Sequence, residues 1–380
     1  MNRRRWIGTG MGAALVGAVG VGLIVAPAGA VAAPQLPPVT PEDLVASVMS
    51  AEPGALAGTV QIQNGLGLPA LPGLGAAANG TSTVRVWSGG DHKARVALPQ
   101  GEGEKTFVSD GTTRWAYDSQ DRTAVRVPQS APGGPSAGGP SAGGPGGGLT
   151  ADPSADPVAA ASQVVGELRR SSTVTVDGTA EVAGRPAYQL VLTPAPTERT
   201  LLRQVRVAVD AQSRLPLQLT VLANGSAAPA LQVGFEELTY GPQDPALFSF
   251  TPPPGTTVTD GPAGARGGPD RSGPPEGTQV VGDGWDTVVV SREPKAGAPG
   301  APAPGAPVTP GAPATPPAPA GRGPDAAGTP DLSTLGTPVS GPWGTGRVIT
   351  TAVGTAIVTD DGRIAAGAVP EQVLTEALTR

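Results

Sequence analysis

Residues 172–194 read STVTVDGTAEVAGRPAYQLVLTP, and they begin a series of β-strand patterns that continues to residue 250. Apolar residues take every second position again in VRVAVDAQSRLPLQLTV (205–221) and around VGFEELTYG (233–241). Successive side chains of a strand point to opposite faces, so each segment presents one apolar face to a common interior. Asp177-Gly178 and Asn224-Gly225 supply the positive φ angles typical of tight hairpins. The pattern therefore predicts an antiparallel meander.

Composition divides the chain into folded and unfolded parts. The 380 residues include 57 glycines and 45 prolines, which concentrate in three tracts at 130–148, 256–276 and 294–332. Such tracts cannot bury a core, so we expect a disordered insertion at 130–148 and disordered linkers in the other two. The remaining residues are enough for one domain at 39–255, a strand segment at 277–293 and a small module at 346–380.

The residue types that carry most enzyme chemistry are scarce. The chain has no cysteine, which excludes disulfides and thiolate metal sites. Its one histidine, His92, lies in a polar turn and is expected to be solvated there, which argues against a histidine-dependent triad or a multi-histidine metal centre. Asp360-Asp361 precedes a glycine, which is typical of a turn, and Glu236 and Glu237 are adjacent on a strand and point to opposite faces. We therefore expect that the protein is not an enzyme and that it has no catalytic residue, no cofactor and no metal site. The net charge of −6 argues against nucleic acid as a partner.

The N-terminus has the features of an export signal. A basic segment at 3–5 precedes an uncharged run at 6–33, and Ala28 and Ala30 are small residues suited to cleavage. Residues 1–30 are predicted to be a signal peptide that is cleaved after Ala30. The alternative is a retained anchor in the plasma membrane, because residues 6–25 are long enough to span a bilayer. Both alternatives place the rest of the chain outside the cytoplasm.

Helical patterns precede two of the strand runs. Thr40 can cap a helix whose first residue is Pro41 and which extends to residue 51. A second helix is predicted at 157–170, where Arg169 and Arg170 complement the negative C-terminal end. Near the end of the chain, strands at 347–358 and 363–369 are expected to form a hairpin, and a short helix is expected at 370–378.

Several segments together resemble a known family. They are GTVQIQ (58–63), DGTTRWAYD (110–118), the strand segments 172–194, 205–221 and 233–241, and LFSFTPPPG (247–255). In this order, after an export signal, they resemble the LolA-like family of outer-membrane lipoprotein carriers, which is related in fold to LolB and to the sensor domain of RseB/MucB. The resemblance covers about 39–255 and is closest to the secreted actinobacterial branch. It implies an α+β fold: an unclosed antiparallel β-barrel, or half-barrel, with covering helices and an apolar cavity for acyl chains.

The strand phases and this implied half-barrel predict which side chains line such a cavity, although the sequence alone does not determine which face is inside. The helices at 41–51 and 157–170 are expected to cover the mouth. The predicted lining residues are apolar or aromatic and take alternate positions in their strands: Trp115, Tyr117, Val174, Val176, Tyr188, Leu190, Val205, Val207, Leu217, Leu219, Val233 and Phe235.

The expected function is extracytoplasmic binding or carriage of a lipid or lipoprotein acyl chain in the cell envelope. Each buried methylene contributes about 0.8 kcal/mol, so a chain of about 16 carbons would gain on the order of 10 kcal/mol before ordering costs. One alternative is an RseB-like sensor that contacts a membrane-bound anti-sigma factor, with a membrane protein as partner. Another is an envelope interaction protein whose helices fill the cavity. We expect a monomer in each case.

Overall fold

The computed structural model describes residues 35–52, 54–68, 79–128, 157–261, 278–292 and 336–380. The expected signal segment at 1–30 and the insertion at 130–148 lie outside the described residues. The same holds for the linker at 294–332 and for most of the linker at 256–276. Within the described residues the strands form two sheets, one of twelve strands and one of six.

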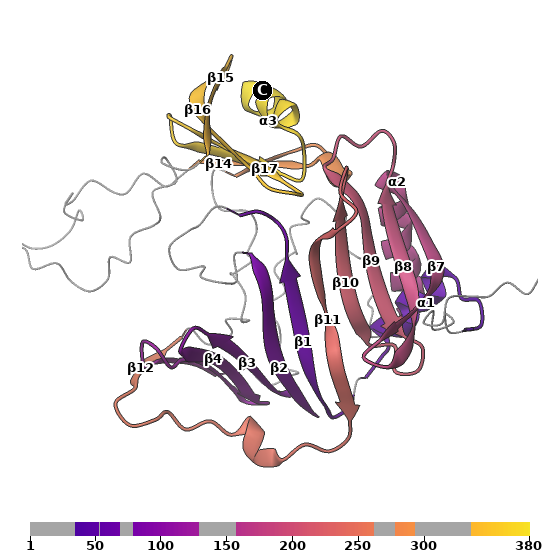
Figure 1. Cartoon of the computed structure of the whole chain (residues 1–380), viewed down its shortest axis with the longest axis vertical. Coiled ribbons are helices and arrows are strands. Elements are labelled where there is room, and N and C mark those ends of the chain that lie inside the picture. The colour runs from indigo at the N-terminus through magenta and orange to yellow at the C-terminus, as the bar shows by residue number, and fades with distance from the viewer. Residues whose placement is uncertain (1–34, 53, 69–78, 129–156, 262–277, 293–335) are drawn as a thin grey trace, which may run out of the picture. The chain divides into compact units, whose positions relative to one another are not determined.

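The large sheet is unclosed and almost wholly antiparallel. Its strand order is β12-β6-β5-β4-β3-β2-β1-β11-β10-β9-β8-β7, and among the described strands only β12 and β6 pair in parallel. The strands turn progressively along the sheet, so that β3 and β4 run across the direction of β9 and β10 (Figure 1). The strands are β1 (Leu56–Asn64), β2 (Gly80–Gly90), β3 (Lys93–Gln100), β4 (Gly103–Asp110), β5 (Thr113–Asp118), β6 (Thr123–Pro128), β7 (Ser172–Val182), β8 (Arg185–Pro194), β9 (Leu202–Asp210), β10 (Pro216–Ala223), β11 (Pro229–Tyr240) and β12 (Thr257–Asp260).

Two meanders, β1–β6 and β7–β11, make up this sheet together with the edge strand β12, and they join where β1 pairs antiparallel with β11. The predicted α+β half-barrel with covering helices is therefore confirmed. One turn differs from expectation. Asp177-Gly178 forms an irregularity inside β7, where the register shifts between Val176 and Thr179, and the hairpin turn is Ala183-Gly184. Both of these turn residues have positive φ, 51° and 70°, as such a turn requires.

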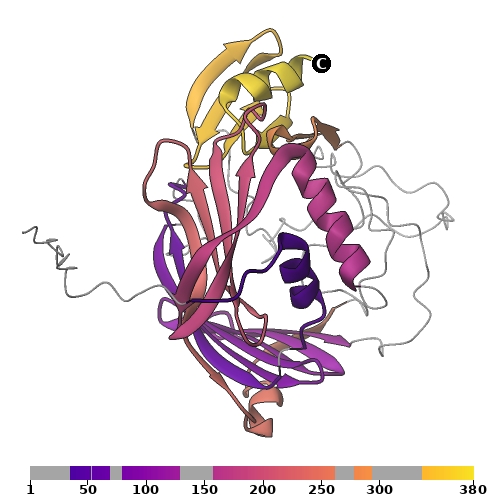
Figure 2. The ribbon, with the colours of Figure 1, turned by 90° about the vertical axis from the view of Figure 1, so that its right-hand side faces the viewer.

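Two helices lie side by side on one face of the sheet, as Figure 2 shows. They are α1 (Pro41–Met49) and α2 (Pro157–Ser171). The predicted start of α1 is confirmed: the Thr40 hydroxyl accepts a hydrogen bond from the Asp43 N–H, and Pro41 is the first helical residue. Arg169 of α2 forms an ion pair with Glu42 of α1. The short α1 depends on packing, since so few residues are marginal as an isolated helix.

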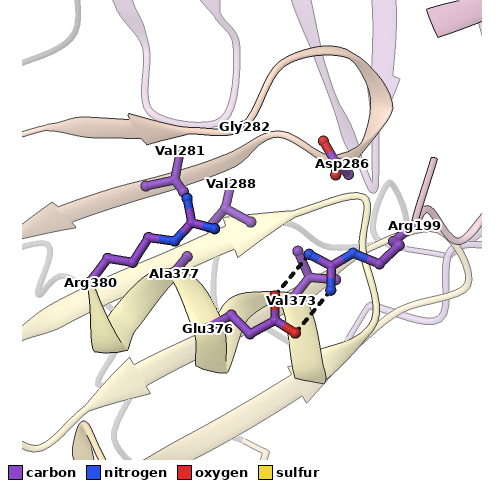
Figure 3. Close-up of a pocket in the computed structure, with 9 residues that line it drawn as sticks. All are labelled: Arg199, Val281, Gly282, Asp286, Val288, Val373, Glu376, Ala377 and Arg380. Atoms are coloured by element: carbon purple, nitrogen blue, oxygen red, sulfur yellow. Dashed lines mark hydrogen bonds and ion pairs between the residues drawn. The ribbon is translucent and has the colours of Figure 1, made fainter. Parts of the chain in front are cut away.

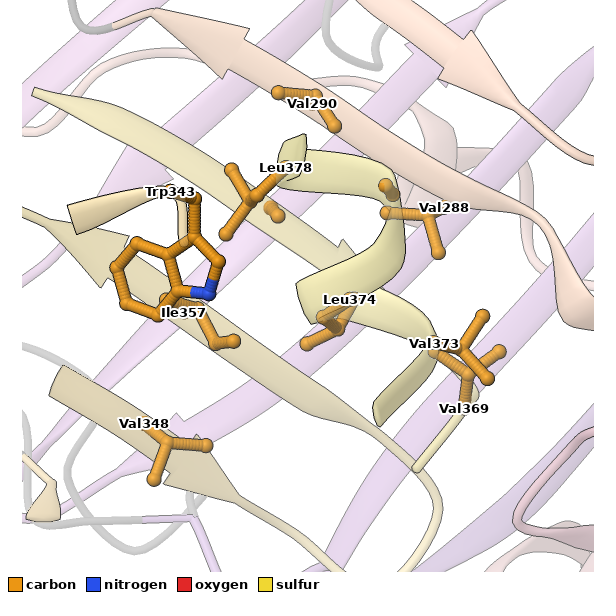
Figure 4. Close-up of a cluster of buried hydrophobic side chains, with 11 residues drawn as sticks. Val288, Val290, Trp343, Val348, Ile357, Val369, Val373, Leu374 and Leu378 are labelled. Atoms are coloured by element: carbon orange, nitrogen blue, oxygen red, sulfur yellow. The ribbon is translucent and has the colours of Figure 1, made fainter. Parts of the chain in front are cut away.

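The second sheet has the order β13-β14-β18-β17-β16-β15. The strand segment expected at 277–293 is part of it, because β14 pairs antiparallel with β18. The expected C-terminal hairpin is instead a meander, β15–β18, because residues 347–358 contribute to two strands and not to one. One apolar cluster holds this module together, with Leu374 and Ile357 fully buried in it (Figure 4). The elements are β13 (Gln279–Val281), the 3₁₀ turn η3 (Gly284–Asp286), β14 (Val288–Arg292), β15 (Thr337–Gly341), β16 (Gly344–Thr350), β17 (Thr355–Thr359), β18 (Arg363–Gly367) and α3 (Glu371–Thr379).

Candidate functional site

One face of the large sheet carries an almost unbroken row of apolar side chains; we call it the inner face, because α1 packs on it. Residues that lie directly opposite each other in neighbouring strands share a face, so the pairing register traces the row from strand to strand. From β7 to β1 it comprises Val176, Leu190, Val207, Leu219, Val233 and Ile62. It continues from Val60 to β6 through Val84, Val86, Val96, Phe107, Ala116 and Val125.

The opposite, outer face is polar over the middle of the sheet. There the corresponding row reads Gln189, Ala208, Gln218, Gly234, Gln61 and Thr83. The long polar side chains hydrogen-bond one another; Arg206 Nε, for example, donates to Gln204 Oε1 at 2.6 Å. This face has the character of a solvated surface, whereas the inner face needs an apolar partner.

Helix α1 supplies that partner at one end of the inner face. Leu44 of α1 is fully buried against Tyr188 and Val209. Beyond α1 some of the apolar side chains are open: Leu219 is 36% exposed and Phe107 is 47% exposed, whereas Val84 between them is buried. Single exposed apolar residues are ordinary, but a contiguous set on one concave face marks a binding surface.

The far end of the inner face is hollowed. The hollow has a volume of about 560 Å³, within the range of roughly 300–1,000 Å³ typical of ligand pockets. Its lining is apolar except for a serine and an arginine: Ala94, Val96, Phe107, Val108, Ser109, Arg114, Trp115, Ala116, Val125 and Val127. The hollow can therefore make hydrophobic contacts with a ligand, and one of its lining residues, Arg114, is charged.

Nine of the twelve predicted lining residues share the inner face: Val174, Val176, Tyr188, Leu190, Val205, Val207, Leu219, Val233 and Phe235. Several of them, such as Val207, lie beneath α1, so they are core residues of the sheet-helix contact. Phe235 also packs against the cluster that contains Leu217. The open part of the face begins at Leu219.

The side chains of the other three residues do not share this face, although Trp115 contributes to the wall of the hollow. Leu217 lies at an irregularity between Pro216 and Gln218 and is buried with Ala187 and Ala208. The side chains of Trp115 and Tyr117 share the outer face with Val108 and Ala124, which are buried there.

Trp115 and Tyr117 pack on Phe250, with ring centroids 5.4 and 5.5 Å apart, respectively. The segment after β11, which includes the 3₁₀ turn η2 (Pro245–Phe248), covers the outer face at this end of the sheet. The two aromatic residues therefore form a core with this segment. Their alternation shows that they share a face, but the segment that covers it is more than 120 residues away in sequence.

Of the twelve predicted lining residues, only Trp115 lines the hollow, and the other nine residues of its lining were not predicted. Ala116 lies between Trp115 and Tyr117, and Val125 and Val127 alternate with Arg126. Their period-2 phase was visible in the sequence and could have marked a second apolar face. The prediction instead places the larger side chains of the same strand, Trp115 and Tyr117, on the cavity side.

A second, smaller pocket has a volume of about 50 Å³ and is lined in part by α3 (Figure 3). Arg199 and Glu376 in its wall form two hydrogen bonds, of 2.9 and 2.8 Å. Hydrogen bonds from Arg199 are the main cause that lowers the pKa of Glu376, and desolvation acts in the other direction. These charges satisfy each other, and the volume is too small for an acyl chain.

The described residues hold no group of three or more His, Cys, Asp or Glu side chains placed to bind a metal ion. No helix in the described part of the chain is long and apolar enough to cross a membrane.

The chain matches no family model and no curated protein. It is similar to solved structures. Pseudomonas aeruginosa MucB in complex with MucA is 17% identical, with a TM-score of 0.41, covering 88% of this chain and 94% of that one. An uncharacterised conserved protein from Thermus thermophilus is 11% identical, with a TM-score of 0.33; the match covers 58% of this chain and 98% of that one.

A LolA superfamily protein from Nitrosomonas europaea is 12% identical, with a TM-score of 0.22, covering 56% of this chain and 99% of that one. The solved structures similar to this chain thus include both groups that the sequence resemblance names, MucB and the LolA superfamily.

Proposed function

We propose that the chain is an extracytoplasmic binding protein that holds a lipid or lipoprotein acyl chain against the open part of the inner face. The observation that supports this most directly is the apolar row that continues beyond α1 into a hollow of about 560 Å³. Placement outside the cytoplasm rests on the basic and uncharged segments at the N-terminus. A membrane-bound protein partner and the actinobacterial origin stay predictions.

The residues of the open surface are suited to binding an acyl chain and not to catalysing a reaction. Each methylene that leaves water contributes about 0.8 kcal/mol, and this gain needs only apolar contact. In the alternative of an envelope protein whose helices fill the cavity, side chains such as Phe107 and Val125 would be covered. They are 47% and 40% exposed.

Val125→Asp is expected to weaken acyl-chain binding by at least about tenfold, because a charged carboxylate would have to lose its hydration against the bound chain. The fold should be little affected, since Val125 is 40% exposed. Binding can be measured by displacement of a fluorescent fatty acid from the delipidated, purified protein.

Val258→Asp is the matched control. Val258 is 46% exposed on the neighbouring strand β12, but it pairs with Ala124 and so lies on the outer face. The substitution Val258→Asp should therefore leave acyl-chain binding unchanged. Absence of acyl-chain binding by the wild-type protein, or equal loss in both variants, would rule out the proposed site.

A further inference from the structure

The hollow contains one charged side chain, that of Arg114, among its ten lining residues. Arg114 is the second residue of β5 and lies opposite Ser109 of β4 and Val127 of β6. Its position in the strand gives it the same face as Ala116, in the apolar row. An arginine here places a permanent positive charge at the end of an apolar surface.

Within the described residues, Arg114 has no ion pair and no hydrogen bond from its guanidinium. Two acidic residues lie four residues from Arg114 along the chain, and both have other partners. Asp118 forms an ion pair with Lys105 at 3.4 Å. Asp110 is engaged in its own turn. Its Oδ1 accepts hydrogen bonds from the Thr112 N–H and hydroxyl and from the Thr113 N–H, at 2.7 to 2.8 Å. The positive charge of Arg114 is therefore left for another anion.

We infer that the hollow selects single-chain amphiphiles with an anionic head, with the acyl chain along the apolar row and the phosphate or carboxylate on Arg114. This inference rests on the proposed function and adds the class of ligand. The guanidinium can form two parallel hydrogen bonds to either kind of oxyanion. Phe107, Ala116 and Val125 lie in the neighbouring strands to receive the chain.

The test compares ligands that share a chain of about 16 carbons and differ in the head: palmitate, lysophosphatidic acid and an uncharged monoacylglycerol. In the full-length protein, Arg114→Gln should weaken binding of both anionic ligands by about tenfold, the effect of losing a charge-assisted hydrogen bond. It should change monoacylglycerol binding by less than about twofold. Arg114→Lys should retain part of the preference, and added salt should reduce it.

Arg122→Gln is the control, because Arg122 lies in the turn between β5 and β6 and does not line the hollow. Inorganic phosphate alone should not displace the ligands at millimolar concentration. Equal weakening of charged and uncharged ligands by Arg114→Gln, or no weakening of either, would overturn this inference and leave the proposed function standing. If only one anionic head depends on Arg114, the shared phosphate-or-carboxylate class is overturned. Failure of all three ligands to bind wild-type protein would overturn the proposed function and this inference with it.

Discussion

Leu217→Asp is expected to lower the free energy of unfolding by about 4 kcal/mol or more. Leu217 is 1% exposed and packs with Val182, Ala187 and Ala208, so the new carboxylate would be buried without a partner. Urea unfolding followed by circular dichroism should show an earlier midpoint. A variant too unstable to purify should show the same defect as a loss of soluble protein.

Leu219→Asp, two residues further along the same strand, is the matched control. Leu219 is 36% exposed on the inner face, opposite Val207 and Val233. Its substitution should cost about 1 kcal/mol or less, because the carboxylate can stay hydrated, while acyl-chain binding should fall. Equal loss of stability in the two variants would contradict the strand geometry described here.

Leu217 and Leu219 show where the alternation of residues along a strand no longer predicts the face of the sheet on which a side chain lies. A strict period of two assigns Leu217 and Leu219 to one face. The register shifts between Pro216 and Gln218, so Gln218 lies opposite Ala208 and Leu217 enters the cluster around Ala187. Proline has no N–H to donate to a neighbouring strand and is found at strand starts and irregularities. Pro216 therefore gives a local reason for the register shift. The face that Leu217 takes as a result is determined by the pairing with β9, which the local sequence does not show.

Local chemistry predicted most of the elements. The cap at Thr40 and the alternation in β8, β9 and β11 depend on residues close in sequence, and these were confirmed. Long-range pairings could not be predicted in the same way. The pairing of β14 with β18, for example, joins segments about 70 residues apart across a linker. The position of the hollow depends on such contacts, because Phe250 covers the aromatic face of β5 and leaves Ala116 on the open face.

Asp210→Ala is expected to destabilise the protein by about 3–5 kcal/mol, because it breaks a buried ion pair and leaves the other charge without its partner. Asp210 is fully buried, and its carboxylate accepts hydrogen bonds from Arg185 Nε and the Ser213 hydroxyl, both at 2.7 Å. The Arg185 guanidinium also lies 4.8 Å from the centroid of the Tyr240 ring. The network thus joins the start of β8, the end of β9 and the end of β11.

The exposed pair Arg126–Asp260 provides the comparison. Its side chains are 48% and 66% exposed, so Asp260→Ala should cost less than about 1 kcal/mol in urea unfolding. A loss of similar size in the two variants would show that burial does not strengthen the Asp210 network.

The contribution of the Asp210 charge should also depend on pH. Burial by itself raises the pKa of Asp210, but the hydrogen bonds from Arg185, Ser213 and the Gln212 N–H outweigh it and lower the pKa below its usual value. A carboxyl with a lowered folded-state pKa stabilises the protein above its unfolded pKa of about 3.9, and this stabilisation is lost as the pH falls toward the folded value. The stability difference between wild type and Asp210→Asn should therefore be constant from about pH 7 to 5 and shrink below about pH 4. Urea titrations across this range measure it, and a difference that stays constant down to pH 3 would show that the Asp210 charge does not stabilise the fold.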